Sequence, residues 1–371
     1  MDKKRYDRVV IGGGLFGAYS SIVLGNLGHT VLLVEQAPEL MSRASMVNQA
    51  RLHTGLHYPR SIVTARESLR YYAKFRERFP AAVFDFQQIY AIASHNSKTS
   101  SRDFRDFVKR LGLDFEEVAP DRYFNPGTVE IALKVEEPTF DAEILRRQIL
   151  REIESQPNIE IRLGTTVVGG LLSERGSSLL LSGDSTIETD GIVIAAYAGI
   201  NPIRQLLGLT SLPLSFELAE IVLGSVSPEM SGIGFTVMDG PFWSMMPFGN
   251  SGFVSLTSVG ITPLRKNRSL PIFPCQSLRS GCAPLSLSDC NTCHVKPSSG
   301  LTHHVQQMKF FLRNQDFYTP IKNLMTVKST LNTAEVDDAR PTLIQKEPDS
   351  KTWTVFSGKV STLFDLEGAL N

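Results

Sequence analysis

The sequence predicts an α/β fold in which parallel strands alternate with helices, joined to a second part rich in antiparallel strands. Three observations support this prediction. The first 35 residues read as strand, glycine-rich turn, helix and strand. Short apolar strands recur in the middle of the chain and near its end, and residues 212–262 alternate as strands with one hairpin. Alternating βα segments beside an antiparallel block indicate two domains.

The N-terminal unit is the clearest element of the chain. Residues 8–11 are apolar apart from Arg8 and end in three glycines, as a buried parallel strand would. From Leu15 to Leu27 the apolar residues recur at helical spacing, and Gly28 follows the expected helix end. Residues 31–34 form a second apolar strand that ends at Glu35. Together these segments form one βαβ unit.

The later elements follow from the same periodicities. Helices are predicted over 64–79, 102–111, 142–155 with Asp141 as N-cap, and about 303–313. Strands are predicted over 89–93, 159–163, 192–196 and 352–356, with a hairpin formed by 242–248 and 253–259. Residues 263–300, rich in Pro, Ser and Cys, are expected to form a loop.

The composition excludes several classes of protein. The 38 basic residues balance the 38 acidic ones among 371 residues, which argues against a nucleic-acid-binding surface. No apolar run reaches the roughly 18–20 residues that a membrane span requires. The N-terminus lacks the apolar core of a signal peptide. Four cysteines are too few for a disulfide-built secreted fold. We therefore expect a soluble cytoplasmic protein.

The glycine-rich turn carries the first functional signal. Gly12, Gly14 and Gly17 fit the G-x-G-x-x-G pattern between a strand and a helix, where a pyrophosphate meets the helix N-terminus. Glu35 follows Gly14 by 21 residues, where a carboxylate accepts hydrogen bonds from a ribose diol. The pattern suits NAD and FAD equally, so the protein could also be an NAD-dependent dehydrogenase that binds no flavin. A glycine-rich turn that holds no ligand is the simplest alternative.

The segment from Ser42 to Tyr58 resembles the second flavin-contacting segment of the D-amino-acid-oxidase-like flavoproteins. This superfamily includes glycine and sarcosine oxidases, and the local match is nearest to glycerol-3-phosphate dehydrogenase and L-2-hydroxyglutarate oxidase. Two C-terminal segments resemble the family as well: Arg340-Pro341 resembles its Arg-Pro segment, and residues 357–362 resemble its last glycine-containing turn. In residues 42–58 the positions that match are Asn48, Leu52, His53, Gly55 and Tyr58, and those that depart are Gln49, Ala50, Arg51 and His57.

The resemblance implies a discontinuous, Rossmann-like FAD-binding domain and an α+β substrate domain built on a mostly antiparallel sheet. The expected FAD-binding domain comprises 1–80, 156–211 and 325–371. The expected substrate domain comprises 81–155 and 212–324, with a Cys-rich loop at 263–300. The residues that the glycine motif and the resemblance together assign to FAD are Gly12, Gly14, Leu15, Phe16, Gly17, Glu35, Gln36, Arg43, Ser45, Asn48, Gln49, Val167, Ala196, Gly358, Lys359, Val360, Ser361 and Thr362.

The resemblance also implies the chemistry. A hydride would pass from a C–N or C–O bond of a small anionic amino or hydroxy acid to flavin N5, with O₂ or another acceptor reoxidising the flavin. His53 is the expected base, and His57 and Arg60 are alternatives. Arg340 is expected to grip the anionic group, unless it pairs with the adjacent Asp337 or Asp338. A larger carrier-bound or sugar-linked substrate, or a non-catalytic FAD-binding protein, remains open.

Lys359 and the helix that follows it are expected to stabilise negative charge on the reduced flavin. A solvated surface lysine is the alternative. Trp243 and Met245 lie on one face of the predicted hairpin, where core packing is their expected role.

All four cysteines fall between positions 275 and 293. Cys275, Cys282, Cys290 and Cys293 are predicted to bind one structural zinc ion, because four thiolates complete a tetrahedral site and the loop around them has few apolar residues. Free thiols, a disulfide or an iron–sulfur cluster are the alternatives.

Overall fold

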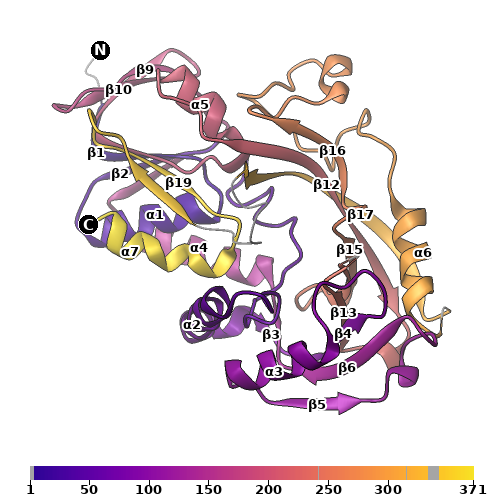
Figure 1. The fold of residues 1–371 in the computed structure, drawn as a ribbon. Coiled ribbons are helices and arrows are strands. Elements are labelled where there is room, and N and C mark those ends of the chain that lie inside the picture. The colour runs from indigo at the N-terminus through magenta and orange to yellow at the C-terminus, as the bar shows by residue number, and fades with distance from the viewer. Residues whose placement is uncertain (1–3, 241, 315, 333–341) are drawn as a thin grey trace.

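The computed structural model describes residues 4–240, 242–314, 316–332 and 342–371, and two large sheets organise them (Figure 1). The first sheet has eight strands in the order β18-β19-β11-β1-β2-β8, with β10 and β9 added beside β11. Strands β1, β2, β8, β11 and β19 run parallel. The strands are β1 (Lys4–Ile11), β2 (Val31–Val34), β8 (Ile159–Arg162), β9 (Val167–Leu171), β10 (Ser177–Leu181), β11 (Ser185–Ile194), β18 (Leu343–Lys346) and β19 (Thr352–Phe356).

Helices cover both faces of this sheet, which is why its central strands are apolar throughout. On one face α1 (Leu15–Asn26) and α4 (Ala142–Glu154) pack against Val10 and Leu33, together with the C-terminal α7 (Leu366–Ala369). On the other face α5 (Ile200–Leu206) packs against Leu32 and Ile194 (Figure 1). Helix α4, which the sequence-based boundaries place in the substrate domain, therefore packs with the first sheet.

The second sheet has nine strands in the order β16-β12-β15-β14-β13-β4-β6-β5, with β17 also paired to β12. All its pairs are antiparallel except β4 with β13. The strands are β4 (Gln87–Ala93), β5 (Phe115–Val118), β6 (Val129–Val135), β12 (Leu214–Val226), β13 (Ile233–Met238), β14 (Trp243–Pro247), β15 (Val254–Ser258), β16 (Pro263–Arg268) and β17 (Tyr318–Leu331).

Helices α6 (Leu301–Phe311) and α3 (Ser101–Leu111) pack on this sheet. The ring of Trp243 stacks on Phe311 of α6 with centroids 5.8 Å apart, and Trp243 and Met245 are fully buried. Their side chains belong to the hydrophobic core. Helix α2 (Ile62–Arg78) and the short strands β3 (Val83–Phe84) and β7 (Thr139–Phe140) complete this set of elements.

One long strand and part of the second sheet are not predicted from the sequence. Strand β17 pairs with β12 along its whole length, from Tyr318 opposite Val226 to Leu331 opposite Leu214. Its sequence mixes lysines, a proline and apolar residues, so no local pattern indicates a partner about a hundred residues away. Residues 263–268, predicted as loop, form strand β16 on the other side of β12.

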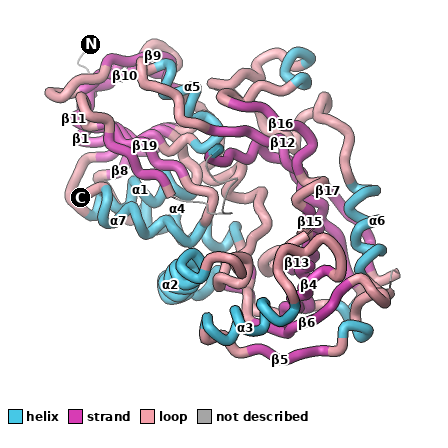
Figure 2. The backbone as a smooth tube through the Cα atoms, viewed as in Figure 1, coloured by secondary structure: helices cyan, strands magenta, loops and turns pink. Residues whose placement is uncertain are grey.

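Two long connections, drawn mostly pink in Figure 2, leave these sheets; the second contains one short helical turn, Pro274–Leu278. One joins β2 to α2 through residues 35–61, and the other joins β16 to α6 through residues 269–300. Both contribute to the site described below. Among the described residues, no helix combines the length and the apolar character needed to cross a membrane.

Candidate flavin and active site

A cavity lies where four parallel strands end. Residues that follow β1, β2, β11 and β19 face one another there, because the carboxyl ends of parallel strands meet at one edge of the sheet. The cavity encloses about 1270 Å³, open solvent at its mouth included. Its walls are Gly12, Gly14, Leu15, Phe16, Glu35, Gln36, Met41–Ser45, Asn48, Ala195–Gly199, Leu287–Cys290, Met325–Val327, Val355 and Ser357–Val360.

The glycine loop suits a pyrophosphate. Gly12 has φ +106°, which favours glycine. A Cβ on Gly17 would lie 1.8 Å from the carbonyl oxygen of Gly12, so Gly17 allows α1 to pack against the loop. A Cβ on Gly14 would approach only Ser45 Oγ, at 3.4 Å, so Gly14 borders the cavity itself. Any larger side chain at Gly14 would occupy the space of a ligand.

The N-terminus of α1 opens toward this cavity. No side chain caps the helix at Gly14, and its first turn holds no acidic residue. The N–H of Leu15 donates to Ser45 Oγ at 2.9 Å, which ties the loop after β2 to the helix start. Uncapped helix N–H groups and the helix dipole attract an anion, so this end fits a diphosphate.

Glu35 braces the glycine loop and also lines the cavity. Its Oε2 accepts a hydrogen bond from the N–H of Gly13 at 2.6 Å, and its Oε1 accepts one from the N–H of Ala37 at 2.7 Å. A carboxylate has about four acceptor positions. Two of them therefore remain for the hydroxyls of a ribose.

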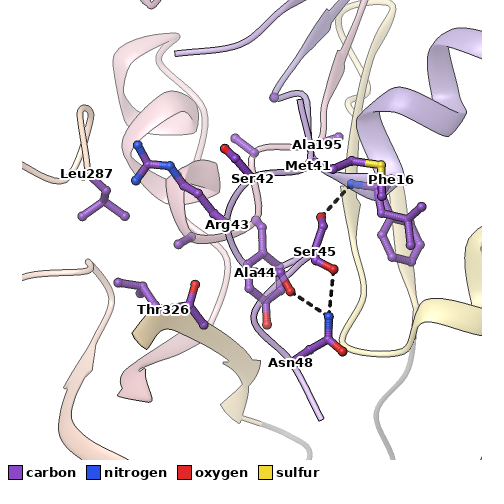
Figure 3. A pocket seen from close by; sticks show the side chains of 18 of the residues that line it. Phe16, Met41, Ser42, Arg43, Ala44, Ser45, Asn48, Ala195, Leu287 and Thr326 are labelled. Atoms are coloured by element: carbon purple, nitrogen blue, oxygen red, sulfur yellow. Dashed lines mark hydrogen bonds between the residues drawn. The ribbon is translucent and has the colours of Figure 1, made fainter. Parts of the chain in front are cut away.

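The loop after β2 forms the wall shown in Figure 3. Asn48 holds it in shape: its Nδ2 donates to the carbonyls of Ala44 and Ser45, and its Oδ1 accepts from the N–H of Ala50. Arg43 lines the cavity, and its Nε is buried without a hydrogen-bond partner among the described residues. An orphaned guanidinium N–H at the cavity is what a phosphate oxygen would satisfy.

The C-terminal turn forms the facing wall. Lys359 donates its N–H to Ser357 Oγ at 3.1 Å, and Thr362 Oγ1 donates to the carbonyl of Lys359 at 2.9 Å. Thr362 and Ser361 therefore lie behind the turn, and they do not line the cavity. The Nζ of Lys359 lies 4.4 Å from the centre of the Tyr58 ring.

Most of the sequence-predicted FAD residues meet at this cavity, and five do not line it. Gly17 packs against Gly12, and Val167 lies in β9, where its side chain is 1% exposed within the core. Those absent from the walls are Gly17, Gln49, Val167, Ser361 and Thr362. The walls formed by 287–290 and 325–327 are not predicted as part of an FAD site, although Cys290 belongs to the predicted zinc cluster.

A buried polar network lies beside the segment that carries His53. Arg51 is 1% exposed in its side chain and donates to Glu137 Oε2 at 3.0 Å and to Tyr90 OH at 2.7 Å. Its Nη2 donates to Thr236 Oγ1 and Ser244 Oγ, each at 2.9 Å. In the sequence, Arg51 is marked only by its departure from the family pattern, and no motif marks Glu137 or Tyr90. Arg51 and Glu137 are 86 positions apart in the sequence, which conceals their pairing.

His53 and His57 both join this network. Nδ1 of His53 lies 3.3 Å from Glu137 Oε1, and Nδ1 of His57 lies 2.9 Å from Tyr90 OH. Burial lowers the pKa of His53 to about 4, and the charges of Arg51 and Lys359 act in the same direction, while Glu137 opposes them. His53 is therefore neutral near pH 7 and able to accept a proton.

Of the other two predicted side chains, the structure describes Arg60. The guanidinium of Arg60 lies 3.6 Å from Asp239 Oδ1. Arg340, together with Asp337 and Asp338, lies outside the described residues.

The four cysteines are free thiols. All four are described, and no three of their sulfurs lie within 4.8 Å of one another. Cys290 lines the cavity, and Cys275 and Cys290 pack against the core of the first sheet. The loop therefore has apolar contacts of its own, and the geometry gives the zinc prediction no support.

These features define an FAD-dependent oxidoreductase. The chain belongs to the family described as "DAO: FAD dependent oxidoreductase", which matches residues 7–250. This confirms the assignment to the D-amino-acid-oxidase-like superfamily and FAD as the cofactor of the family.

Two named relatives are fungal. The chain is 26% identical to FAD-dependent monooxygenase FPY4 of Fusarium mangiferae over 75% of this chain and 70% of that one. It is 27% identical to FAD-dependent monooxygenase kojA of Aspergillus flavus, and the aligned residues cover 64% of this chain and 57% of kojA.

Solved structures share the whole fold. Glycine oxidase from Geobacillus kaustophilus has a TM-score of 0.71 at 13% identity, covering 99% of this chain and 94% of that one. NikD, described as an unusual amino acid oxidase essential for nikkomycin biosynthesis, has a TM-score of 0.72 at 15% identity, covering 99% of this chain and 95% of that one. These likenesses confirm the predicted fold class.

Proposed function

We propose that the protein oxidises a C–N or C–O bond of a small anionic amino or hydroxy acid, with FAD as hydride acceptor. The observation that carries the proposal is the position of His53. Its ring centroid lies 5.9 Å from that of Tyr58, which in turn contacts Lys359 at the cavity wall. His53 does not itself line the cavity, and Tyr58 connects this neutral imidazole to Lys359 in the cavity wall.

Different residues around the cavity would bind different parts of FAD. The glycine loop, the N-terminus of α1 and Arg43 would hold the diphosphate, and Glu35 would hold the adenosine ribose. Lys359 would place positive charge at the flavin ring. Bound FAD supplies the two-electron acceptor that no side chain of the protein provides.

His53 would take the proton that the substrate loses. Hydride removal from a carbon bearing N–H or O–H leaves that proton to be accepted, and an imidazole that is neutral at pH 7 accepts it. The guanidinium of Arg51 already contacts Glu137 and four other side chains, those of His57, Tyr90, Thr236 and Ser244. We therefore do not assign the binding of the substrate anion to Arg51. Arg340 keeps that role as a prediction.

The relatives' names favour a second candidate, a monooxygenase that inserts one atom of O₂ into its substrate. A screen of amino and hydroxy acids, in which the flavin is bleached without oxygen, would identify substrates. Oxygen-18 labelling of the product then separates the two functions: an oxidase releases H₂O₂ and leaves the product unlabelled by ¹⁸O₂. Carrier-bound and sugar-linked acids belong in the same screen.

A further inference from the structure

The two carboxylate oxygens of Glu137 have different surroundings. Oε2 accepts hydrogen bonds from Arg51 Nη1 and Tyr90 OH. Oε1 faces Nδ1 of His53 at 3.3 Å, and neither of these two buried atoms has another hydrogen-bond partner among the described residues. A proton on Nδ1 is what would satisfy both atoms, since an ionised carboxylate only accepts.

From this contact we propose that Glu137 is a positioning residue, which holds the Nδ1–H tautomer of His53 and leaves the Nε2 lone pair to take the substrate's proton. The inference deepens the proposed function and rests on it. It assigns a role to a residue that the family resemblance does not mark.

The exposure of His53 agrees with this orientation. The side chain is 17% exposed, whereas Nδ1 has no access to solvent. The accessible part of the ring is therefore not Nδ1. Bound FAD would supply the acceptor for the hydride of the substrate C–H bond, and Nε2 of His53 would take the N–H or O–H proton as the C=N or C=O bond forms.

The charges that face His53 fit a base that becomes charged only during the reaction. Arg51 and Lys359 disfavour the imidazolium, and Glu137 favours it. The carboxylate would stabilise the imidazolium as it forms, as the aspartate of a Ser-His-Asp triad does. A metal ion among His53, His57 and Glu137 would compete with the guanidinium of Arg51, which already lies 3.0 Å from the carboxylate.

Glu137→Gln makes the tautomer testable. Two donors, Arg51 and Tyr90, face one end of the side chain, so they select the amide oxygen there. The amide NH₂ then faces Nδ1 of His53 and requires it to accept, which moves the ring proton to Nε2. We expect flavin reduction to slow by roughly 10²- to 10⁴-fold, the usual contribution of a positioned general base.

The decisive readout needs no substrate. We would record long-range ¹H–¹⁵N spectra of ¹⁵N-histidine-labelled holoenzyme and assign the His53 signals with His53→Gln. The expected result is an Nδ1–H tautomer in the wild type and an Nε2–H tautomer in Glu137→Gln. The control is Glu136→Gln, whose side chain is 65% exposed in the wild type and which should keep the Nδ1–H tautomer.

A wild-type Nε2–H tautomer would overturn the inference, even if Glu137→Gln does not fold. An unchanged His53 spectrum in a folded, flavin-loaded Glu137→Gln would overturn it as well. If both tautomers are as expected but no amino or hydroxy acid reduces the flavin, the result would count against the proposed function and not against the role of Glu137.

Discussion

Lys359 and Tyr58 join the two segments that resemble the flavoprotein family: the ammonium group of Lys359 lies 4.4 Å from the centre of the Tyr58 ring. One residue belongs to the C-terminal turn of the cavity and the other to the segment that carries His53. The contact holds a positive charge at the cavity wall.

We expect Lys359→Met to weaken sulfite binding to the flavin by about 10- to 100-fold, because a charged hydrogen bond to the anionic adduct contributes roughly 1.5–3 kcal/mol. FAD should remain bound. Spectrophotometric titration with sulfite measures the affinity. Lys346→Met is the matched control, since Lys346 lies over the Trp353 ring at 5.3 Å and outside the cavity walls. Equal sulfite affinity in wild type and Lys359→Met would place the ammonium group away from the flavin.

Gly14→Val should give a folded protein that does not retain FAD. Gly14 has extended backbone with φ −68°, which valine adopts, and the new side chain would fill the diphosphate space. Visible absorbance per chain measures loading, and circular dichroism checks folding. Gly169→Ala is the control, because its Cβ would meet only Leu180, at 3.8 Å. Full flavin loading of Gly14→Val would show that the diphosphate lies elsewhere.

The free energy of unfolding should depend on pH through His53. Its folded pKa is about 4, below the value of about 6.5 for an exposed histidine. The unfolded chain therefore binds more protons, and stability falls as the pH drops from about 6.5 to 4, by up to about 3 kcal/mol. Buried His304, whose pKa burial also lowers to about 4, contributes to this loss in every variant that retains it. Urea unfolding across this range should therefore show a smaller loss in His53→Gln than in the wild type, with the exposed His303→Gln as control. Parallel curves for wild type and His53→Gln would contradict the assignment.

The thiols should react in a fixed order. Burial raises the pKa of Cys290 to about 11. Although burial opposes it, the hydrogen bond with Arg279 lowers the pKa of Cys293. We expect Cys293 to react with a maleimide at least roughly tenfold faster than Cys290, since the thiolate is the nucleophile. Mass spectrometry of time points gives the order. Equal protection of all four thiols, with one equivalent of zinc by elemental analysis, would restore the zinc prediction.

The sequence predicts the parts of the site that are local in the chain. Gly12, Gly14 and Glu35 lie within one βαβ unit, whose strand, turn and helix signals agree with one another. The pairing of Glu137 with Arg51 and His53 is not predictable in this way, because it depends on where β6 and β7 place residues 136–138. The cavity wall at 287–290 depends likewise on Asn291, which binds the backbone of Met325 in the unpredicted strand β17.

The central claim is that FAD in this cavity accepts electrons from a small anionic acid. The most direct measurement is the visible spectrum of the purified holoenzyme during anaerobic addition of amino and hydroxy acids. We expect one FAD per chain and bleaching of the oxidised flavin band by at least one acid, with the rate of bleaching strongly reduced in His53→Gln. Two results would contradict this function. One is a protein that cannot be loaded with FAD, and the other is a bound flavin that every acid leaves oxidised although dithionite reduces it.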